Sequence, residues 1–239
     1  VYRYRSAVNG AHAYPEFAEY FHHYALKDSP YSSHYYAERM AGNNQRLLDV
    51  GCGEGFFAEH LRNNGNEVTG IDALEAPIHA ASMREYFQTD LQLGLGPVAA
   101  QLREREFDKV LILDVLEHLN QPERVLRDVY PLIRPSGGSV IVSLPNVANI
   151  FVRLNLLFGR FDYADRGIMD RTHVRFFTRK TARALLESNG YRIVSEQYSI
   201  IPLDRGLRVK PRGLVDRVGS GVLKFLTGLF PTLFGYQLI

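Results

Sequence analysis

Apolar runs that end at acidic residues alternate along the chain with stretches in which apolar residues recur at helical spacing. Short runs of this kind are typical of buried parallel strands, and strands that alternate with helices indicate a doubly wound α/β fold. In such folds, ligands bind at the carboxyl ends of the strands. The first expected strand begins near Arg46, and later ones are expected at 67–71, 86–89, 108–113 and 174–177.

The turn after the first strand carries the most specific signal. Asp49 ends the apolar run, and glycines follow at 51, 53 and 55, before a helical segment at 56–63. A glycine-rich turn between a strand and a helix lets the backbone approach a ligand closely. A dinucleotide-binding turn would need its third glycine where Phe56 stands. The carboxylate of Asp49 also favours a cationic ligand over a pyrophosphate.

Three further strands are followed by acidic residues, namely Asp72, Asp90 and Asp114. A carboxylate at the position of Asp72 can accept two hydrogen bonds from the hydroxyls of a ribose. Dehydrogenases place an acid there too, so Asp72 alone indicates a ribose and no particular cofactor.

The motif Asp49-x-Gly51-x-Gly53-x-Gly55 resembles the first motif of class I S-adenosylmethionine-dependent methyltransferases, and 114–119 resembles the motif after their fourth strand. The resemblance covers about 33–198, and its second half resembles a bacterial-type branch often found near glycan-building enzymes. It implies a Rossmann-like, mostly parallel sheet of seven strands, with S-adenosylmethionine as cofactor and S-adenosylhomocysteine as product. The cofactor-binding residues that it implies are Asp49, Gly51, Cys52, Gly53, Gly55, Asp72, Ala73, Asp90, Leu91, Asp114 and Val115.

The chain divides into three regions around this cofactor site. The methyltransferase domain is expected at 41–200. The segment 1–40 holds eight of the fourteen tyrosines, and we expect it to form a helical lid that brings Tyr31 and Tyr35 to the acceptor. Packing of this segment on the sheet edge is the simpler alternative. The segment 201–239 is expected to be an amphipathic helical extension.

An insert at 146–173 is expected to shape the acceptor site. Its first part, 149–158, reads as a helix with Ile150, Leu154, Leu157 and Phe158 on one side. The loop after it ends in Asp-Arg-Thr-His at 170–173, just before an expected strand. The candidates in the insert are His173 and Asp170 as catalytic residues, with His173 at the substrate site, and Asn146 and Arg171 as acceptor-binding residues.

His118 is the leading candidate for a catalytic base, because the loop after the fourth strand lies beside the methyl donor in this fold class. An imidazole that titrates near neutrality suits removal of a proton from an acceptor, and Glu117 or Asp170 is a candidate to orient it. Alternatively, the Asp-x-x-Glu-His sequence serves only to cap a helix. No pair of histidines beside a carboxylate has metal-ligand spacing, so we expect no metal.

The charge of the chain is unevenly distributed. The net charge is +2, but 1–150 holds 13 basic and 19 acidic residues, whereas 151–212 holds 13 and 6. No nucleic-acid-reading motif accompanies the basic block, so we expect it to bind a small anionic substrate or to be a solvated face. The single cysteine fits a reducing, cytoplasmic location, and no bilayer-spanning segment or signal peptide is expected.

The apolar residues of 213–230 recur at helical spacing. This segment could lie on a membrane surface, cover the acceptor pocket or form a seam between two copies of the chain, and docking on its own domain or on a partner chain is the default. The function expected is O-methylation of a small or carrier-linked polar acceptor such as a sugar. The alternatives are N-methylation of an amine, O-methylation of a quinone-like lipid, and cofactor binding by a non-catalytic partner protein.

Overall fold

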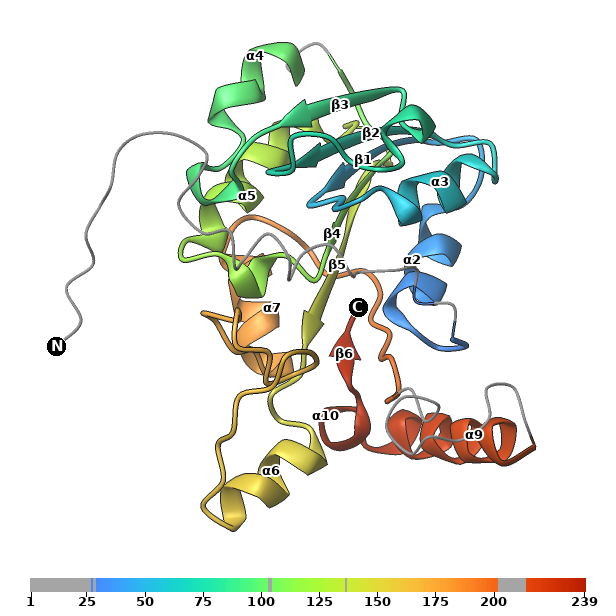
Figure 1. Ribbon diagram of the computed structural model, residues 1–239, viewed down its shortest axis with the longest axis vertical. Coiled ribbons are helices and arrows are strands. Elements are labelled where there is room, and N and C mark those ends of the chain that lie inside the picture. Colours follow the sequence, from blue (N-terminus) through green and yellow to red (C-terminus); the bar gives the residue numbers. More distant parts are fainter. Residues whose placement is uncertain (1–26, 28, 103–104, 136, 202–213) are drawn as a thin grey trace, which may run out of the picture.

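The computed structural model describes residues 27, 29–102, 105–135, 137–201 and 214–239. This part of the chain forms a six-stranded sheet in the order β3-β2-β1-β4-β5-β6 (Figure 1). Five strands run in parallel, and the last is antiparallel to its neighbour. The strands are β1 (Arg46–Val50), β2 (Glu67–Asp72), β3 (Glu85–Gln88), β4 (Lys109–Leu113), β5 (Ser139–Pro145) and β6 (Gln237–Leu238).

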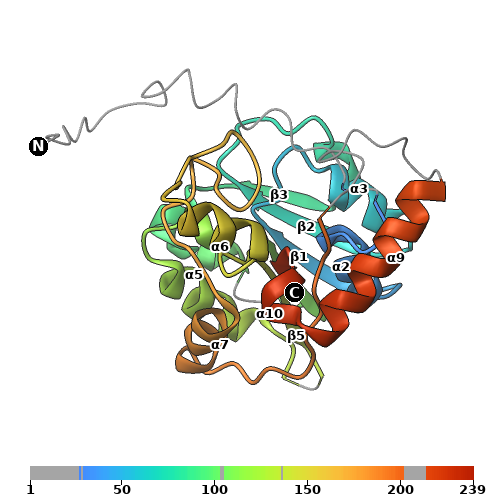
Figure 2. The same ribbon diagram turned by 90° about the horizontal axis from the view of Figure 1, so that it is seen from below.

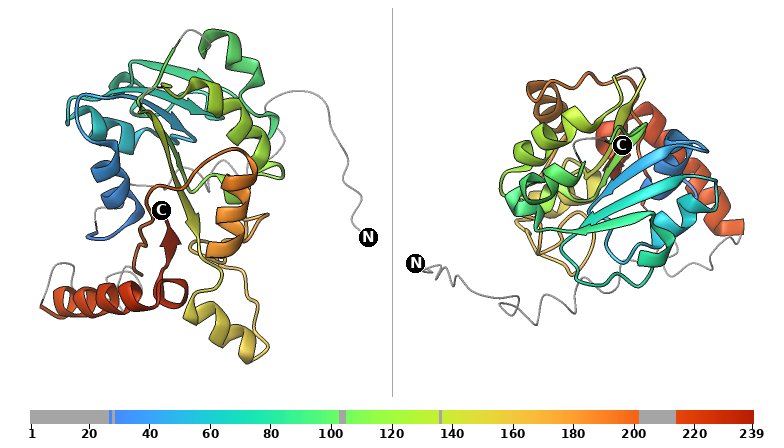
Figure 3. Two further views of the ribbon diagram at one scale, coloured as in Figure 1. Left: turned by 180° about the vertical axis from the view of Figure 1, so that it is seen from behind. Right: turned by 90° about the horizontal axis from the view of Figure 1, so that it is seen from above.

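Helices cover both faces of the sheet (Figures 1 and 3). On one face lie α2 (Ser33–Ala41) and α3 (Phe56–Arg62), and on the other α4 (Ala99–Leu102), α5 (Pro122–Val129) and α7 (Arg179–Ser188). Beyond the end toward which β5 points lie α6 (Ile150–Leu157), α9 (Leu214–Leu229) and α10 (Pro231–Phe234), as Figure 2 shows from below. Short 3₁₀ turns cover Ala80–Ser82, Leu91–Leu93, Gly96–Val98, Leu116–His118 and Tyr130–Leu132.

Successive side chains of the central strands join two different buried clusters, because they point to opposite faces of the sheet. Leu48 of β1 and Ile112 of β4 belong to one buried cluster, together with Leu126 of α5. Leu47 and Leu111, their neighbours in sequence, belong to a second cluster under α2 and α3. With both faces covered, the central strands are buried along most of their length, which explains the short, mainly apolar runs in the sequence.

The α/β class is as predicted, but the described part of the chain has six strands where seven were expected. The segment 174–177 does not form a strand, and its last residue, Phe177, makes a single parallel bridge to Asn146. The edge of β5 is occupied by the C-terminal residues, which pair Leu144 with Leu238 and Pro145 with Gln237.

The expected lid lies largely outside the described residues, as do 202–213 of the extension. The described end of the lid is α2, which begins where the Ser32 hydroxyl accepts a hydrogen bond from the Tyr35 backbone N–H (3.2 Å). The expected helix at 149–158 is present as α6, but its apolar side faces solvent, since Leu157 and Phe158 are 76% and 75% exposed. In the described residues, no helix is sufficiently long and apolar to span a bilayer.

The C-terminal segment is held to its own domain by two fully buried asparagines. The side-chain amide of Asn146 donates hydrogen bonds to the backbone carbonyls of Thr232 and Gly235, each at 2.9 Å. The amide of Asn149 donates to the same Gly235 carbonyl at 3.0 Å. Buried carbonyls need such donors, because an unpaired one costs most of a hydrogen bond.

We therefore expect Asn146→Ala to lower the free energy of unfolding by about 1–3 kcal/mol, since it removes two hydrogen bonds and leaves only Asn149 to donate to the Gly235 carbonyl. The melting temperature should fall by roughly 2–4 °C per kcal/mol. The matched control is Asn155→Ala, on the exposed side of α6, which should change stability by less than about 0.5 kcal/mol. Equal melting temperatures for the two variants would show that Asn146 does not hold the tail.

Candidate functional site

A cavity of about 260 Å³ opens at the carboxyl ends of β1, β2 and β4. It lies where a doubly wound sheet binds its ligands. Its lining is formed by the glycine-rich turn after β1, the ends of β2 and β4, the segment after β3, and residues from the N-terminal side of α2. The lining residues are Lys27, His34, Asp49, Gly51, Cys52, Gly53, Phe56, Phe57, Asp72, Ala73, Leu74, Asp90, Leu91, Gln92, Leu113, Asp114, Val115, His118 and Leu119.

The turn after β1 requires glycine for two physical reasons. Gly51 has a φ of 78°, and a Cβ there would lie 2.4 Å from a methyl carbon of Val115. Gly55 has a φ of 82° at the start of α3, and a Cβ there would lie 2.6 Å from the terminal methyl of Met83. Only glycine allows this left-handed backbone and this close approach, so the motif builds the floor of the cavity.

Asp72 at the end of β2 holds the same turn. One carboxylate oxygen accepts a hydrogen bond from the Gly53 N–H (2.8 Å), and the other accepts from the Leu74 N–H (3.1 Å). Each carboxylate oxygen has a second lone pair, which is available to a ligand hydroxyl. Asp49 lies beside it in the cavity wall, where burial, and then the charge of Asp72, raise the pKa of Asp49 to about 7. A positively charged ligand would restore the ionised form of Asp49.

Asp114, at the end of β4, has a φ of 56° and binds three other parts of the chain. One carboxylate oxygen pairs with the ammonium of Lys27. The other accepts hydrogen bonds from the hydroxyl of Ser143 in β5 (2.6 Å) and from the side-chain amide of Gln237 in β6 (2.5 Å). Burial alone would raise the pKa of Asp114, but the ammonium of Lys27 and these hydrogen bonds lower it below its ordinary value. Asp114 is therefore an ionised part of the cavity wall.

The N-terminal side of the cavity is formed by Lys27 and His34. The ring of His34 stacks on Phe57 with centroids 4.5 Å apart, and its Nδ1 accepts a hydrogen bond from the Lys27 backbone N–H at 3.0 Å. Burial, and then the charge of Lys27, lower the pKa of His34 to about 3, so its ring is neutral. Tyr31 and Tyr35, which were predicted to reach the acceptor, pack edge to face with each other and are not among the lining residues.

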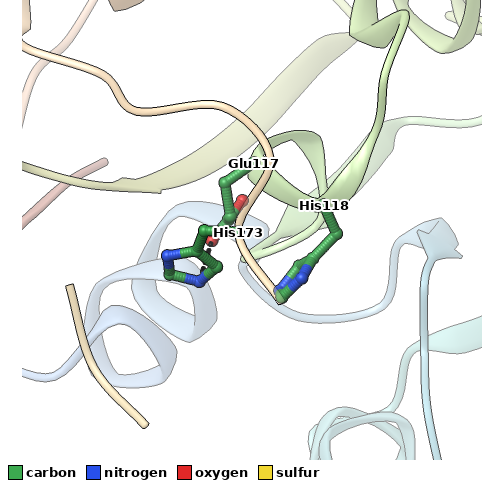
Figure 4. Close-up of side chains that lie close together, drawn as sticks. All are labelled: Glu117, His118 and His173. Atoms are coloured by element: carbon green, nitrogen blue, oxygen red, sulfur yellow. Dashed lines mark ion pairs between the residues drawn. The ribbon is translucent and has the colours of Figure 1, made fainter. Parts of the chain in front are cut away.

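Beside the cavity, Glu117, His118 and His173 lie together (Figure 4). The Nε2 atom of His173 lies 4.0 Å from a carboxylate oxygen of Glu117, and the two imidazole rings are 4.8 Å apart. Glu117 is fully buried, and neither of its carboxylate oxygens has a hydrogen-bond partner among the described residues. Burial raises the pKa of Glu117 well above its ordinary value and lowers the pKa of both histidines.

The hydrogen bonds of each imidazole determine which nitrogen carries the proton. Nδ1 of His173 faces the backbone carbonyl of Ile168 at 3.1 Å, and Nδ1 of His118 faces that of Thr172 at 3.2 Å. A carbonyl only accepts, so each Nδ1 is protonated and each Nε2 has a lone pair. The Thr172 hydroxyl donates to Asp170 at 2.6 Å, so Asp170 orients the residue that holds His118.

The structure places most, though not all, of the predicted site residues at the cavity. Every residue predicted to bind the cofactor lines it except Gly55, which begins α3. Asp170 and His173 are buried behind His118 and do not line it. Asn146 holds the C-terminal segment, and Arg171 pairs with Asp165. These contacts differ from the acceptor contacts predicted for Asn146 and Arg171.

Several lining residues were missed by the sequence reasoning. Some of them are direct sequence neighbours of predicted residues. Including one more residue beside each predicted one would have found Leu74, Gln92, Leu113 and Leu119. Lys27 and His34 carried no such signal, because only the folded chain brings them to Asp114. The full set of missed residues is Lys27, His34, Phe56, Phe57, Leu74, Gln92, Leu113 and Leu119.

Two ubiquinone biosynthesis O-methyltransferases resemble part of this chain. The protein from Pseudomonas putida is 35% identical over 113 residues, which is 46% of this chain and 48% of that protein. The protein from Maricaulis maris is 34% identical over 109 residues, 44% of this chain and 43% of that protein. The matches thus cover about half the length of these curated relatives.

Solved structures share the fold. An S-adenosylmethionine-dependent methyltransferase from Archaeoglobus fulgidus superposes with a TM-score of 0.54 at 22% identity, covering 85% of this chain and 87% of that chain. A 1,6-didemethyltoxoflavin-N1-methyltransferase from Burkholderia thailandensis, with bound S-adenosylhomocysteine, superposes with a TM-score of 0.50 at 19% identity. The superposition covers 71% of this chain and 72% of that chain.

A family model described as a methyltransferase domain matches residues 16–196, well over half of the chain. The glycine turn and the acids at the strand ends are those that the sequence resemblance implied. The chain therefore belongs to the methyltransferase family.

Proposed function

We propose that this methyltransferase methylates a hydroxyl oxygen of a small or carrier-linked acceptor, and that the acceptor binds beside His118. The observation that carries the proposal is the state of His118. This residue lines the cofactor cavity, its Nδ1 proton is held by the Thr172 carbonyl, and its Nε2 lone pair is available to a hydroxyl proton.

The residues around the cavity fit a cationic nucleoside cofactor. Four carboxylates, those of Asp49, Asp72, Asp90 and Asp114, line it, and Lys27 pairs with only the last of them. We assign the ribose to the free lone pairs of Asp72 and the adenine edge to Asp90 with its neighbour Leu91. When bound, S-adenosylmethionine supplies a methyl group on a positively charged sulfur, and the acidic wall around Asp49 favours that charge.

The chain's own groups prepare the acceptor. Burial lowers the pKa of His118, so its ring is neutral near pH 7 and can accept a proton. Thr172 and Asp170 hold the ring in one tautomer and orientation, which keeps the lone pair available without reorganisation. His173 lies behind His118 and supports its position. Nε2 of His118 would take the hydroxyl proton of the acceptor, while the bound cofactor would supply the methyl group, lose its sulfur–methyl bond and be left as neutral S-adenosylhomocysteine.

Two observations favour an aromatic hydroxyl over the sugar that the sequence resemblance implied. The relatives in Pseudomonas putida and Maricaulis maris are named as ubiquinone biosynthesis O-methyltransferases. In addition, the rings of Phe161, Tyr163 and Phe176 cluster next to His173, with Phe176 6.2 Å from its ring. Aromatic side chains stack well on a flat, apolar acceptor. We therefore propose a phenol-like hydroxyl as the methylated group.

Cofactor affinity should depend on pH through Asp49. Its pKa is raised to about 7, so below that pH the carboxyl is protonated and no longer attracts a cation. We expect affinity for S-adenosylmethionine to fall by up to roughly tenfold per pH unit below neutrality and to level off above it. Calorimetric titrations between about pH 6 and pH 8 measure this. Asp49→Asn should bind more weakly with a flat profile, and an unchanged slope in that variant would assign the effect to another group.

Asp72→Asn should weaken cofactor binding by about 1.5–3 kcal/mol, the range for hydrogen bonds to a charged group. Asparagine retains an acceptor oxygen for one of the two backbone N–H groups, whereas its NH2 group faces the other, so the melting temperature of the variant is measured as well. The control is Asp162→Asn, an exposed residue that does not line the cavity, and it should bind like the parent. Unchanged affinity in a folded Asp72→Asn protein would remove Asp72 from the ribose site.

His118→Ala should lower kcat by roughly 10²- to 10⁴-fold with a panel of phenolic acceptors, while cofactor affinity is retained. His60→Ala is the control, because His60 pairs with Glu38 on the surface and should leave kcat unchanged. His173→Ala should mainly raise the KM of the acceptor. Turnover by His118→Ala at the parent rate would show that His118 takes no proton. Sugar or amine methylation without phenol methylation would contradict the acceptor class.

A further inference from the structure

We infer that Glu117, His118 and His173 form a binding site for a divalent first-row transition metal ion at the wall of the cofactor cavity. Sequence spacing gave no sign of such a site, because His173 is far from the other two residues along the chain. Glu117 and His118 lie in the 3₁₀ turn after β4, and His173 lies in the loop between α6 and α7. The fold brings the three side chains together (Figure 4).

The three ligand atoms are close enough for one ion. They all lie within 4.8 Å of one another, and Nε2 of His173 is 4.0 Å from a Glu117 oxygen. Ligands about 2.1 Å from a tetrahedral zinc ion lie roughly 3.4 Å apart. Small rotations of the side chains would therefore close the site around an ion, with no movement of the sheet.

Glu117 supplies the strongest reason to expect a cation. Its side chain is fully buried, it points toward His173, and neither carboxylate oxygen has a hydrogen-bond partner among the described residues. The charged groups that act on it are the carboxylates of Asp114 and Asp170 and the ammonium of Lys27. Negative charge is thus in excess, and a buried carboxylate without a partner is costly. A bound cation would satisfy both oxygens.

The two histidines are arranged as metal ligands usually are. Each donates its Nδ1 proton to a backbone carbonyl, His173 to Ile168 and His118 to Thr172, and so presents Nε2. Such second contacts fix the tautomer and orientation of ligating imidazoles. One carboxylate and two imidazoles suit zinc, manganese, iron or cobalt better than magnesium, which prefers oxygen ligands throughout.

A cation at this site would have a position open to the cavity, because His118 also lines it. We assign that position to the hydroxyl oxygen of the acceptor, an assignment that rests on the proposed function. With an ion bound, Nε2 of His118 would be a ligand and could not also accept the hydroxyl proton, so the role of His118 as base applies to the metal-free enzyme; the ion would instead promote loss of that proton to water. The cation thus lowers the cost of removing that proton.

The test is cobalt binding by the untagged full chain after treatment with a chelator and dialysis. Titration with Co²⁺, followed by visible absorption, should show one bound ion per chain with the bands of a low-coordinate site. Zn²⁺ should displace it, at one equivalent by elemental analysis. Glu117→Gln and His173→Gln should each weaken binding by more than roughly 100-fold, the upper range for losing a residue that merely orients a ligand.

The control is His79→Gln, since His79 faces Glu59 (3.1 Å) away from the cluster, and it should bind Co²⁺ like the parent. Glu117→Gln should melt no lower than the parent, because a neutral amide of the same shape replaces a buried carboxyl group that has no hydrogen-bond partner among the described residues. Loss of metal binding in this variant would therefore not be caused by unfolding. The absence of one tightly bound Co²⁺, or parent-like binding by Glu117→Gln, would overturn the inference. Phenol methylation without a bound metal would overturn the inference and leave the proposed function standing. Metal binding without methylation would overturn only the proposed acceptor.

Discussion

The carboxylate of Asp114 connects the parts of the chain that form the site. It lies at the end of a central strand in a left-handed backbone conformation, and it binds Lys27, Ser143 and Gln237. These residues come from the segment before α2, from β5 and from the C-terminal strand. A partly buried charge that loses its partners destabilises the fold, so both ends of the described chain are held to the carboxyl edge of the sheet at one point.

This connection explains how the cavity and the proposed acceptor site would share one wall. Asp114 lines the cavity, and three residues later Glu117 begins the group that includes His118 and His173. Glu117 and His118 lie in the short 3₁₀ turn Leu116–His118, in which Leu116 and Glu117 are buried. Acidic groups on the cavity side favour the positive charge of S-adenosylmethionine, whereas the histidine side offers lone pairs to an acceptor or a metal ion.

Local sequence was enough to predict the cofactor turn and the acids at the strand ends. Gly51 and Asp72 act within a few residues of the strands that position them, and glycine at a positive φ leaves a clear pattern. The last strand could not be predicted, because Gln237 and Leu238 form only two residues of strand and depend on the edge of β5. The contact of Lys27 with Asp114 and that of Glu117 with His173 could not be predicted either. In each case, residues far apart in the sequence meet only in the folded chain.

The most direct test of this account is hydrogen–deuterium exchange with and without S-adenosylhomocysteine. Exchange should slow at 51–53, 72–74, 90–92 and 114–119, which surround the cavity. It should also slow at 237–239, because Gln237 binds Asp114 in the same wall. Slowing at the cavity without any change at 237–239 would contradict the link through Asp114. No slowing at the turn after β1 would contradict the placement of the cofactor itself.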